Sequence, residues 1–150
     1  MSTTNAVKEL AIVKAVMALL KLDDAGKISK FFNQEIKAAK EAISGLKLNL
    51  QVKALEYQQE VSKSDKAIED AKEAVNDAFV AVTVEDVANN AKSTAFADTY
   101  WYNVKRAEDT LEALEEQAKQ SKEAYDKAVE KINDQIAKYQ ARIDKIEKFK

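Results

Sequence analysis

The sequence has 150 residues, of which 24 are basic and 26 acidic, so that its net charge at pH 7 is -2. It contains no Cys, His or Pro, which excludes a disulfide framework, a thiolate or imidazole metal site and a Ser-His-Asp triad. With just two Gly as well, most turn signals are missing, and the composition predicts an all-α protein made of long helices.

The first predicted helix covers residues 4–22. Thr3 or Thr4 can cap its start, and the run Asp-Asp-Ala-Gly at residues 23–26 predicts its end. Apolar residues occupy so much of its circumference that more than one side must be covered. We expect this short helix to pack at the open end of a hairpin of two long helices. An apolar face of this helix that the packing leaves uncovered would serve for self-association, for docking into a groove of a partner, or for binding to a membrane surface. Its candidate interface residues are Leu10, Ile12, Val16 and Leu19.

A long helical region is predicted over residues 27–82. Apolar or small side chains recur at every seventh position, and their partners follow three or four residues later, which is typical of a coiled-coil-like stripe. Gly45 lies within this region, so the helix is expected either to continue through it or to break there. The stripe consists of Ile36, Ile43, Leu50, Tyr57, Ser64, Ala71 and Ala78.

Two segments support an α+β alternative. Residues 46–53 alternate between apolar and polar side chains, which is the pattern of a half-buried strand. Residues 79–84 are rich in Val and are also β-prone, so the two segments could pair. The all-helical interpretation is preferred because Leu46 and Leu50 continue the stripe of the long helix. Leu48, Val52 and Leu55 then form a second stripe, suited to a second neighbour.

Residues 83–93 are predicted to form the tip of the hairpin, with Asn89 and Asn90 as the turn signal. Aromatic residues gather on both sides of this tip, and three consecutive ones point in different directions around a helix. They form either a capping mini-core or a contact surface for a protein, since Tyr and Trp are enriched in binding hot spots. The candidate interface residues are Phe79, Phe96, Tyr100, Trp101 and Tyr102.

The third predicted helix covers residues 94–149, and Ser93 or Thr94 can cap it. Its apolar repeat is unbroken and its length matches that of the preceding region. Two helices of equal length with a short connection predict an antiparallel hairpin with coiled-coil-like packing. The repeat consists of Val104, Leu111, Ala118, Tyr125, Ile132, Tyr139 and Ile146.

An acidic run lies within the third helix, between residues 108 and 116, and contains no Lys or Arg. Such a run either attracts a basic partner or a divalent cation, or is a solvated helix face, and the solvated face is the preferred interpretation. The run consists of Glu108, Asp109, Glu112, Glu115 and Glu116.

No catalytic motif is recognisable in the sequence. Gly at positions 26 and 45 alone cannot build a phosphate-binding loop, and a di-iron site of the Glu-x-x-His type needs His. Ser44 and Lys47 have the Ser-x-x-Lys spacing of some acyl-enzymes but lack the companion motifs. We therefore expect no enzyme activity, no cofactor and no metal site.

The balanced charge provides no basic face for nucleic acid. No segment has the features of a signal peptide or a membrane span, which favours a cytoplasmic or virion location. The preferred hypothesis is a structural protein that self-associates, as a homo-oligomer or as a repeated component of a larger particle such as a virus or phage. One alternative is a monomeric adaptor or inhibitor that binds another protein through its aromatic tip. The other is a membrane-active helical hairpin, although membrane binding is disfavoured by the few charges of the first helix.

Overall fold

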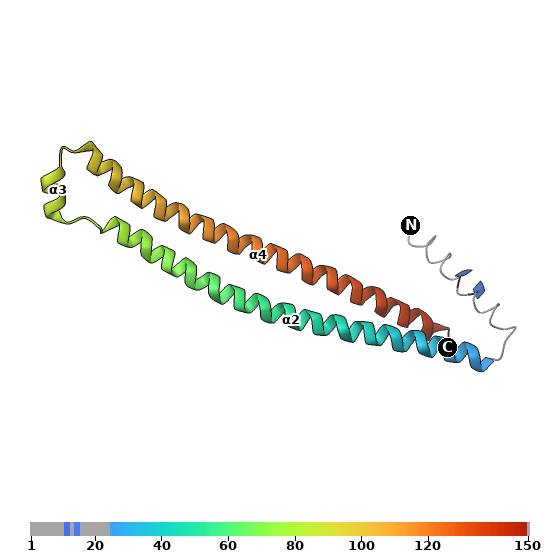
Figure 1. Cartoon of the computed structure of the whole chain (residues 1–150). Helices are drawn as coiled ribbons and strands as arrows, with labels where there is room; N and C mark the ends of the chain where they lie inside the picture. The colour runs from blue at the N-terminus through green and yellow to red at the C-terminus, as the bar shows by residue number, and fades with distance from the viewer. Residues whose placement is uncertain (1–10, 13, 16–24, 150) are drawn as a thin grey trace. The chain divides into compact units, whose positions relative to one another are not determined.

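The computed structural model describes residues 11–12, 14–15 and 25–149. The described chain contains the helices α2 (Ala25–Phe79), α3 (Val84–Asn90) and α4 (Thr94–Lys148), and Figure 1 shows the short α3 connecting the two long helices. Strands are absent from the described residues, so the protein is all-α. Most of the predicted first helix, including Leu10, Val16 and Leu19, lies outside these residues. Ile12 is described, and its side chain is 63% exposed.

The α+β alternative is wrong, because both of its segments are described and neither is a strand. Residues 46–53 lie inside α2, and residues 79–84 contain the end of α2, a short connection and the start of α3. As part of a helix, Leu46 and Leu50 are half-buried, while Leu48 is 61% exposed. The helical stripe of α2 therefore prevails over a local period of two, because it extends from Ile36 to Ala78 within the 55-residue helix.

Gly45 does not interrupt α2, which continues through it in helical geometry. No described glycine has a positive φ, and a Cβ atom added at Gly45 would meet no other atom within 4 Å. This glycine therefore has no steric role in the observed helix.

The long helices differ from the predicted ranges by a few residues at their ends. The region predicted over residues 27–82 is the helix Ala25–Phe79, and the region predicted over residues 94–149 is the helix Thr94–Lys148. The tip predicted over residues 83–93 contains a helix of its own, α3.

A capping box explains why the tip is helical. Thr83 Oγ1 accepts a hydrogen bond of 3.0 Å from the backbone N–H of Asp86, and the Thr83 N–H donates one of 3.2 Å to the Asp86 carboxylate. This reciprocal pair satisfies two N–H groups that the start of a helix otherwise leaves unpaired. Ser93 caps α4 in a similar way, because its Oγ accepts a hydrogen bond of 3.2 Å from the Phe96 N–H.

Helix α2 packs against α4 within each of two compact units. The first unit contains residues 25–49 and 131–149 of the described chain, and the second contains residues 50–130. The core of the first unit is a cluster of branched aliphatic and small side chains from both helices. It consists of Ile36, Ala39, Ile43 and Ile143, with Ile136, Tyr139 and Ile146 packed against it.

The second unit is held by fewer buried side chains. Ala71 and Val104 are buried there. The rings of Tyr57 and Tyr125 stack with their centroids 4.3 Å apart, and Ser121 Oγ donates a hydrogen bond of 2.9 Å to Glu60 Oε1. All residues of both predicted stripes are buried or half-buried, so the apolar repeat identifies the surface along which α2 and α4 meet.

Candidate protein-binding surface

An exposed apolar surface covers the region around α3, in the second unit. Six large apolar side chains from the end of α2, from α3 and from the start of α4 are exposed there, although such side chains are usually buried. We call this set the tip surface. It consists of Phe79 (43% exposed), Val80 (67%), Val84 (90%), Val87 (48%), Trp101 (57%) and Tyr102 (64%).

Trp101 lies against two other aromatic rings. Its ring meets that of Phe79 edge to face, with centroids 6.2 Å apart and planes at 84°. The Tyr100 ring lies at 5.0 Å and 72° from it. Edge-to-face pairs of this kind are attractive, so Trp101 has a defined orientation although more than half of it is exposed.

Tyr100 fixes the start of α4 to the end of α2. Its hydroxyl donates a hydrogen bond of 2.8 Å to the backbone carbonyl of Phe79, the last residue of α2. The final carbonyls of a helix have no partner within the helix, and Tyr100 provides one for a carbonyl of this group. Tyr100 is thereby half-buried and acts as a structural residue of the tip.

The structure divides the aromatic residues predicted for an interface into two groups. Phe96 and Tyr100 are half-buried, as expected for a mini-core, whereas Phe79, Trp101 and Tyr102 are exposed, as expected for a contact surface.

The sequence places Val80, Val84 and Val87 at the tip together with the aromatic residues, but the candidate interface residues did not include these valines. Two of them belong to α3. Thr83 and Asp86 have the spacing of a capping box, and that signal could have identified α3 and its exposed valines from the sequence.

A cavity of about 270 Å³ lies beside the tip surface, lined by residues from α3 and from the start of α4. The lining includes the apolar side chains of Val82, Val87 and Phe96, together with Asn90 and Ser93. The polar groups of Asn90 and Ser93 already bond to neighbouring backbone, at Asp86 O and Phe96 N respectively. The cavity therefore suits an apolar group better than a polar one.

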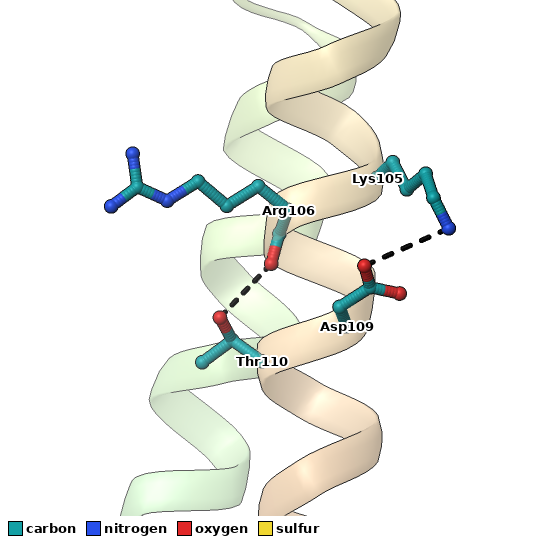
Figure 2. A network of polar contacts seen from close by, with 4 residues as sticks. All are labelled: Lys105, Arg106, Asp109 and Thr110. Atoms are coloured by element: carbon teal, nitrogen blue, oxygen red, sulfur yellow. Dashed lines mark hydrogen bonds and ion pairs between the residues drawn. The ribbon is translucent and has the colours of Figure 1, made fainter.

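The acidic run of α4 is a solvated surface with sparse contacts. Lys105 Nζ lies 3.7 Å from Asp109 Oδ2, and both side chains are more than half exposed. Figure 2 shows this pair and the neighbouring hydrogen bond of 2.9 Å from Thr110 Oγ1 to the Arg106 carbonyl, with the Arg106 side chain extending away from both. Exposed ion pairs of this kind add little stability. Within the described residues, no group of three or more acidic side chains is placed to hold a metal ion.

An open groove of about 590 Å³ lies between α2 and α4 within the second unit, next to Tyr57. Small side chains from both helices face each other there, including Ser64, Ala67 and Ala118. The groove is a consequence of these small side chains, of which Ser64 and Ala118 are stripe residues. Glu60 and Ser121 in its wall already bond to each other.

None of the helices in the described part of the chain is long and apolar enough to cross a membrane. A search against known protein families, curated proteins and solved structures finds no match for this chain. The function is therefore inferred from the tip surface itself.

Proposed function

We propose that this chain is a non-enzymatic structural protein that self-associates through its tip surface, as a homo-oligomer or as a repeated component of a larger particle. The observation that carries the proposal is the exposure of six large apolar side chains around α3. Contiguous apolar patches of this kind on soluble proteins usually mark interaction sites.

The residue types of the tip surface support a protein partner. Trp and Tyr are the residues most enriched in binding hot spots, because each covers a large area at little cost in side-chain entropy. Complete burial of one large apolar side chain contributes roughly 1.5–3 kcal/mol. Phe79, Trp101 and Tyr102 are 43%, 57% and 64% exposed, so covering them would recover roughly half of such a contribution for each side chain.

We further infer that α2 and α4 form an antiparallel, coiled-coil-like hairpin that supports the tip surface. The contacts within the second unit support this inference, because residues later in α2 meet residues earlier in α4. The pairs are Tyr57 with Tyr125, Glu60 with Ser121, and Phe79 with Tyr100. In the first unit, the early part of α2 likewise packs against the late part of α4.

The proposal is tested by light scattering coupled to size-exclusion chromatography. We expect the wild-type chain to have a mass that is a discrete multiple of 16.7 kDa. The double variant Trp101→Ala/Tyr102→Ala should shift this equilibrium toward the monomer by at least tenfold in dissociation constant, because hot-spot residues cost about 2 kcal/mol or more when truncated.

Leu55→Ala is the matched control, because Leu55 is an equally exposed apolar residue, 60% accessible, on α2 outside the tip. It should leave the mass distribution unchanged. A wild-type chain that stays monomeric at all concentrations would contradict self-association. If Leu55→Ala weakened association as much as the double variant does, the tip surface would not be the specific site of self-association.

A monomeric adaptor or inhibitor that binds another protein is the second candidate function, and the cavity beside Trp101 favours it. Its volume of about 270 Å³ is below the usual 300–1,000 Å³ of small-molecule pockets, and it suits a single apolar side chain of a partner. Selection from a displayed peptide library should then yield sequences with one large apolar anchor. Ala97→Leu, which fills the cavity wall, should abolish their binding.

A further inference from the structure

Folding separates the charges of this chain, although they are balanced along the sequence. The helical segments 25–49 and 131–148 of the first unit contain ten basic and five acidic residues, a net charge of +5. The second unit, residues 50–130, contains ten basic and eighteen acidic residues, a net charge of -8. The two units therefore have opposite charges.

The separation arises because each long helix changes sign along its length. Residues 25–49 of α2 have a net charge of +3, and its residues 50–79 have -3. The positive part of α2 packs with the positive end of α4 in the first unit, and the negative parts of both helices belong to the second unit. Summed over a whole helix, these charges nearly cancel.

The tip surface belongs to the negatively charged second unit. Residues 77–98 contain four carboxylates and one lysine, a net charge of -3. Asp98 precedes Trp101 by three residues and Tyr102 by four, so it shares their helix face. No ion pair joins Asp77, Glu85 or Asp98 to another described residue. The apolar side chains of the tip are thus bordered by these unpaired carboxylates, whereas Lys105 and Arg106 lie beside Tyr102 on its other side.

The start of α2, in the first unit, has the complementary composition. Residues 27–40 contain four lysines and one glutamate, a net charge of +3. No acidic residue occupies the first turn of α2, although Asp23 and Asp24 directly precede the helix in the sequence. The Phe31 side chain is 40% exposed among these lysines and stands beside the buried Phe32 at 5.6 Å between ring centroids.

We propose that the tip surface of one copy is covered by residues 27–40 of a second copy. This inference rests on the proposed self-association and specifies its contact. Two different surfaces meet, so that charges of -3 and +3 face each other and Phe31 supplies an apolar side chain to the tip. A contact between two tip surfaces would instead place -3 against -3, which is unfavourable at close range.

Such a contact is heterologous, because each copy uses a different surface on each side. A heterologous contact can be repeated by further copies, and it produces a closed ring or an open filament according to the rotation between them. Since the attracting charges are exposed, the association should weaken as salt rises, because the Debye length falls from about 10 Å at 0.1 M to about 3 Å at 1 M.

Two charge-reversal variants test the proposal. Lys30→Glu/Lys37→Glu/Lys40→Glu changes the start of α2 from +3 to -3, and Asp77→Lys/Glu85→Lys/Asp98→Lys changes the tip from -3 to +3. All six side chains are exposed and none makes a side-chain contact that holds the fold. Each variant alone should associate at least tenfold more weakly than the wild type in sedimentation velocity experiments.

An equimolar mixture of the two variants should recover association. The unchanged acidic tip of the first variant can bind the unchanged lysines of the second, and the two reversed surfaces are again complementary to each other. A matched control, Glu112→Lys/Glu115→Lys/Glu123→Lys, makes the same change in net charge on α4 outside the tip. It should reduce association far less than the reversal at the tip.

The outcomes separate this inference from the proposed function. A wild-type chain that remains monomeric at low and high salt would refute self-association altogether. A wild-type chain that associates independently of salt, or whose variants associate normally or fail to recover on mixing, would refute the charge-complementary contact alone. If a charge-reversal variant loses its helical circular dichroism, a neutral variant at the same positions is used in its place. The neutral variant for the start of α2 is Lys30→Gln/Lys37→Gln/Lys40→Gln, and the one for the tip is Asp77→Asn/Glu85→Gln/Asp98→Asn. Each neutral version is then expected to weaken association and to flatten its salt dependence, and unchanged values would overturn the inference.

Discussion

The rings of Tyr57 in α2 and Tyr125 in α4 stack almost in parallel, with 3° between their planes and 4.3 Å between their centroids. Both residues occupy stripe positions and are half-buried. Next to Tyr57, the groove between the two helices is lined by the small side chains of Ser64, Ala67 and Ala118 as well as by Val61 and Leu114. The stacked pair therefore adds a large contact between α2 and α4 beside these smaller side chains.

A double-mutant cycle on this pair should reveal a direct coupling. Tyr57→Leu and Tyr125→Leu retain apolar contact but remove the ring stacking, so we expect a coupling free energy of about 0.5–1.5 kcal/mol in urea unfolding. Single effects that add within about 0.3 kcal/mol would show that the two rings are merely adjacent. Tyr102→Leu, at an exposed position, serves as the uncoupled reference.

Gly45→Ala should stabilise the protein by about 0.5–1 kcal/mol. Gly in a helix interior costs this amount relative to Ala because the unfolded chain has more freedom to lose, and the added Cβ meets no atom within 4 Å. Urea unfolding would measure the gain. A loss of stability would indicate that the helix does bend or open at this position.

Thr83→Ala should loosen α3 without unfolding the long helices. The substitution removes the capping hydroxyl that accepts the Asp86 N–H, which typically costs about 1 kcal/mol. Amide hydrogen exchange should accelerate within residues 84–90, while that of α2 and α4 remains near the wild-type rate. Thr110→Ala is the control, because the Thr110 hydroxyl bonds back to the Arg106 carbonyl inside α4 and caps no helix.

Ile132→Ala and Trp101→Ala should affect different properties. Ile132 is 6% exposed, so its truncation should destabilise the fold by about 2–4 kcal/mol. Trp101 is 57% exposed, so its truncation should cost less than about 1 kcal/mol in thermal or urea unfolding but should weaken self-association. A large loss of stability in Trp101→Ala with unchanged association would identify the tip as core.

The long helices could be predicted because their signal is repeated many times. One stripe extends from Ile36 to Ala78 and the other from Val104 to Ile146, each through most of a 55-residue helix. One conflicting segment, residues 46–53, therefore could not change the outcome. Leu46 and Leu50 kept their places in the stripe, and Leu48 and Val52 became exposed. Every stripe residue is buried or half-buried, although the buried Phe32, Ala39 and Ile143 lie outside the two stripes.

The details of the tip could not be predicted in the same way. Helix α3 has seven residues, too few for a periodic signal, and it depends on the cap at Thr83. Whether an aromatic ring such as Phe96 or Trp101 points inward depends on where α3 places the neighbouring cavity. The charge separation also required the structure, because it depends on which distant segments pack into the same unit.

The hydrogen bond from Tyr100 to the Phe79 carbonyl links the last turn of α2 to the first turns of α4. No basic side chain lies in that last turn to stabilise its carbonyls, so fraying of α2 must break this bond and displace the aromatic rings together. Trp101, the single tryptophan of the chain, contacts both of the rings involved. Its fluorescence emission should therefore shift when the end of α2 frays, at a temperature below that of global helix melting. The protein thus contains an intrinsic optical reporter for the order of its tip surface.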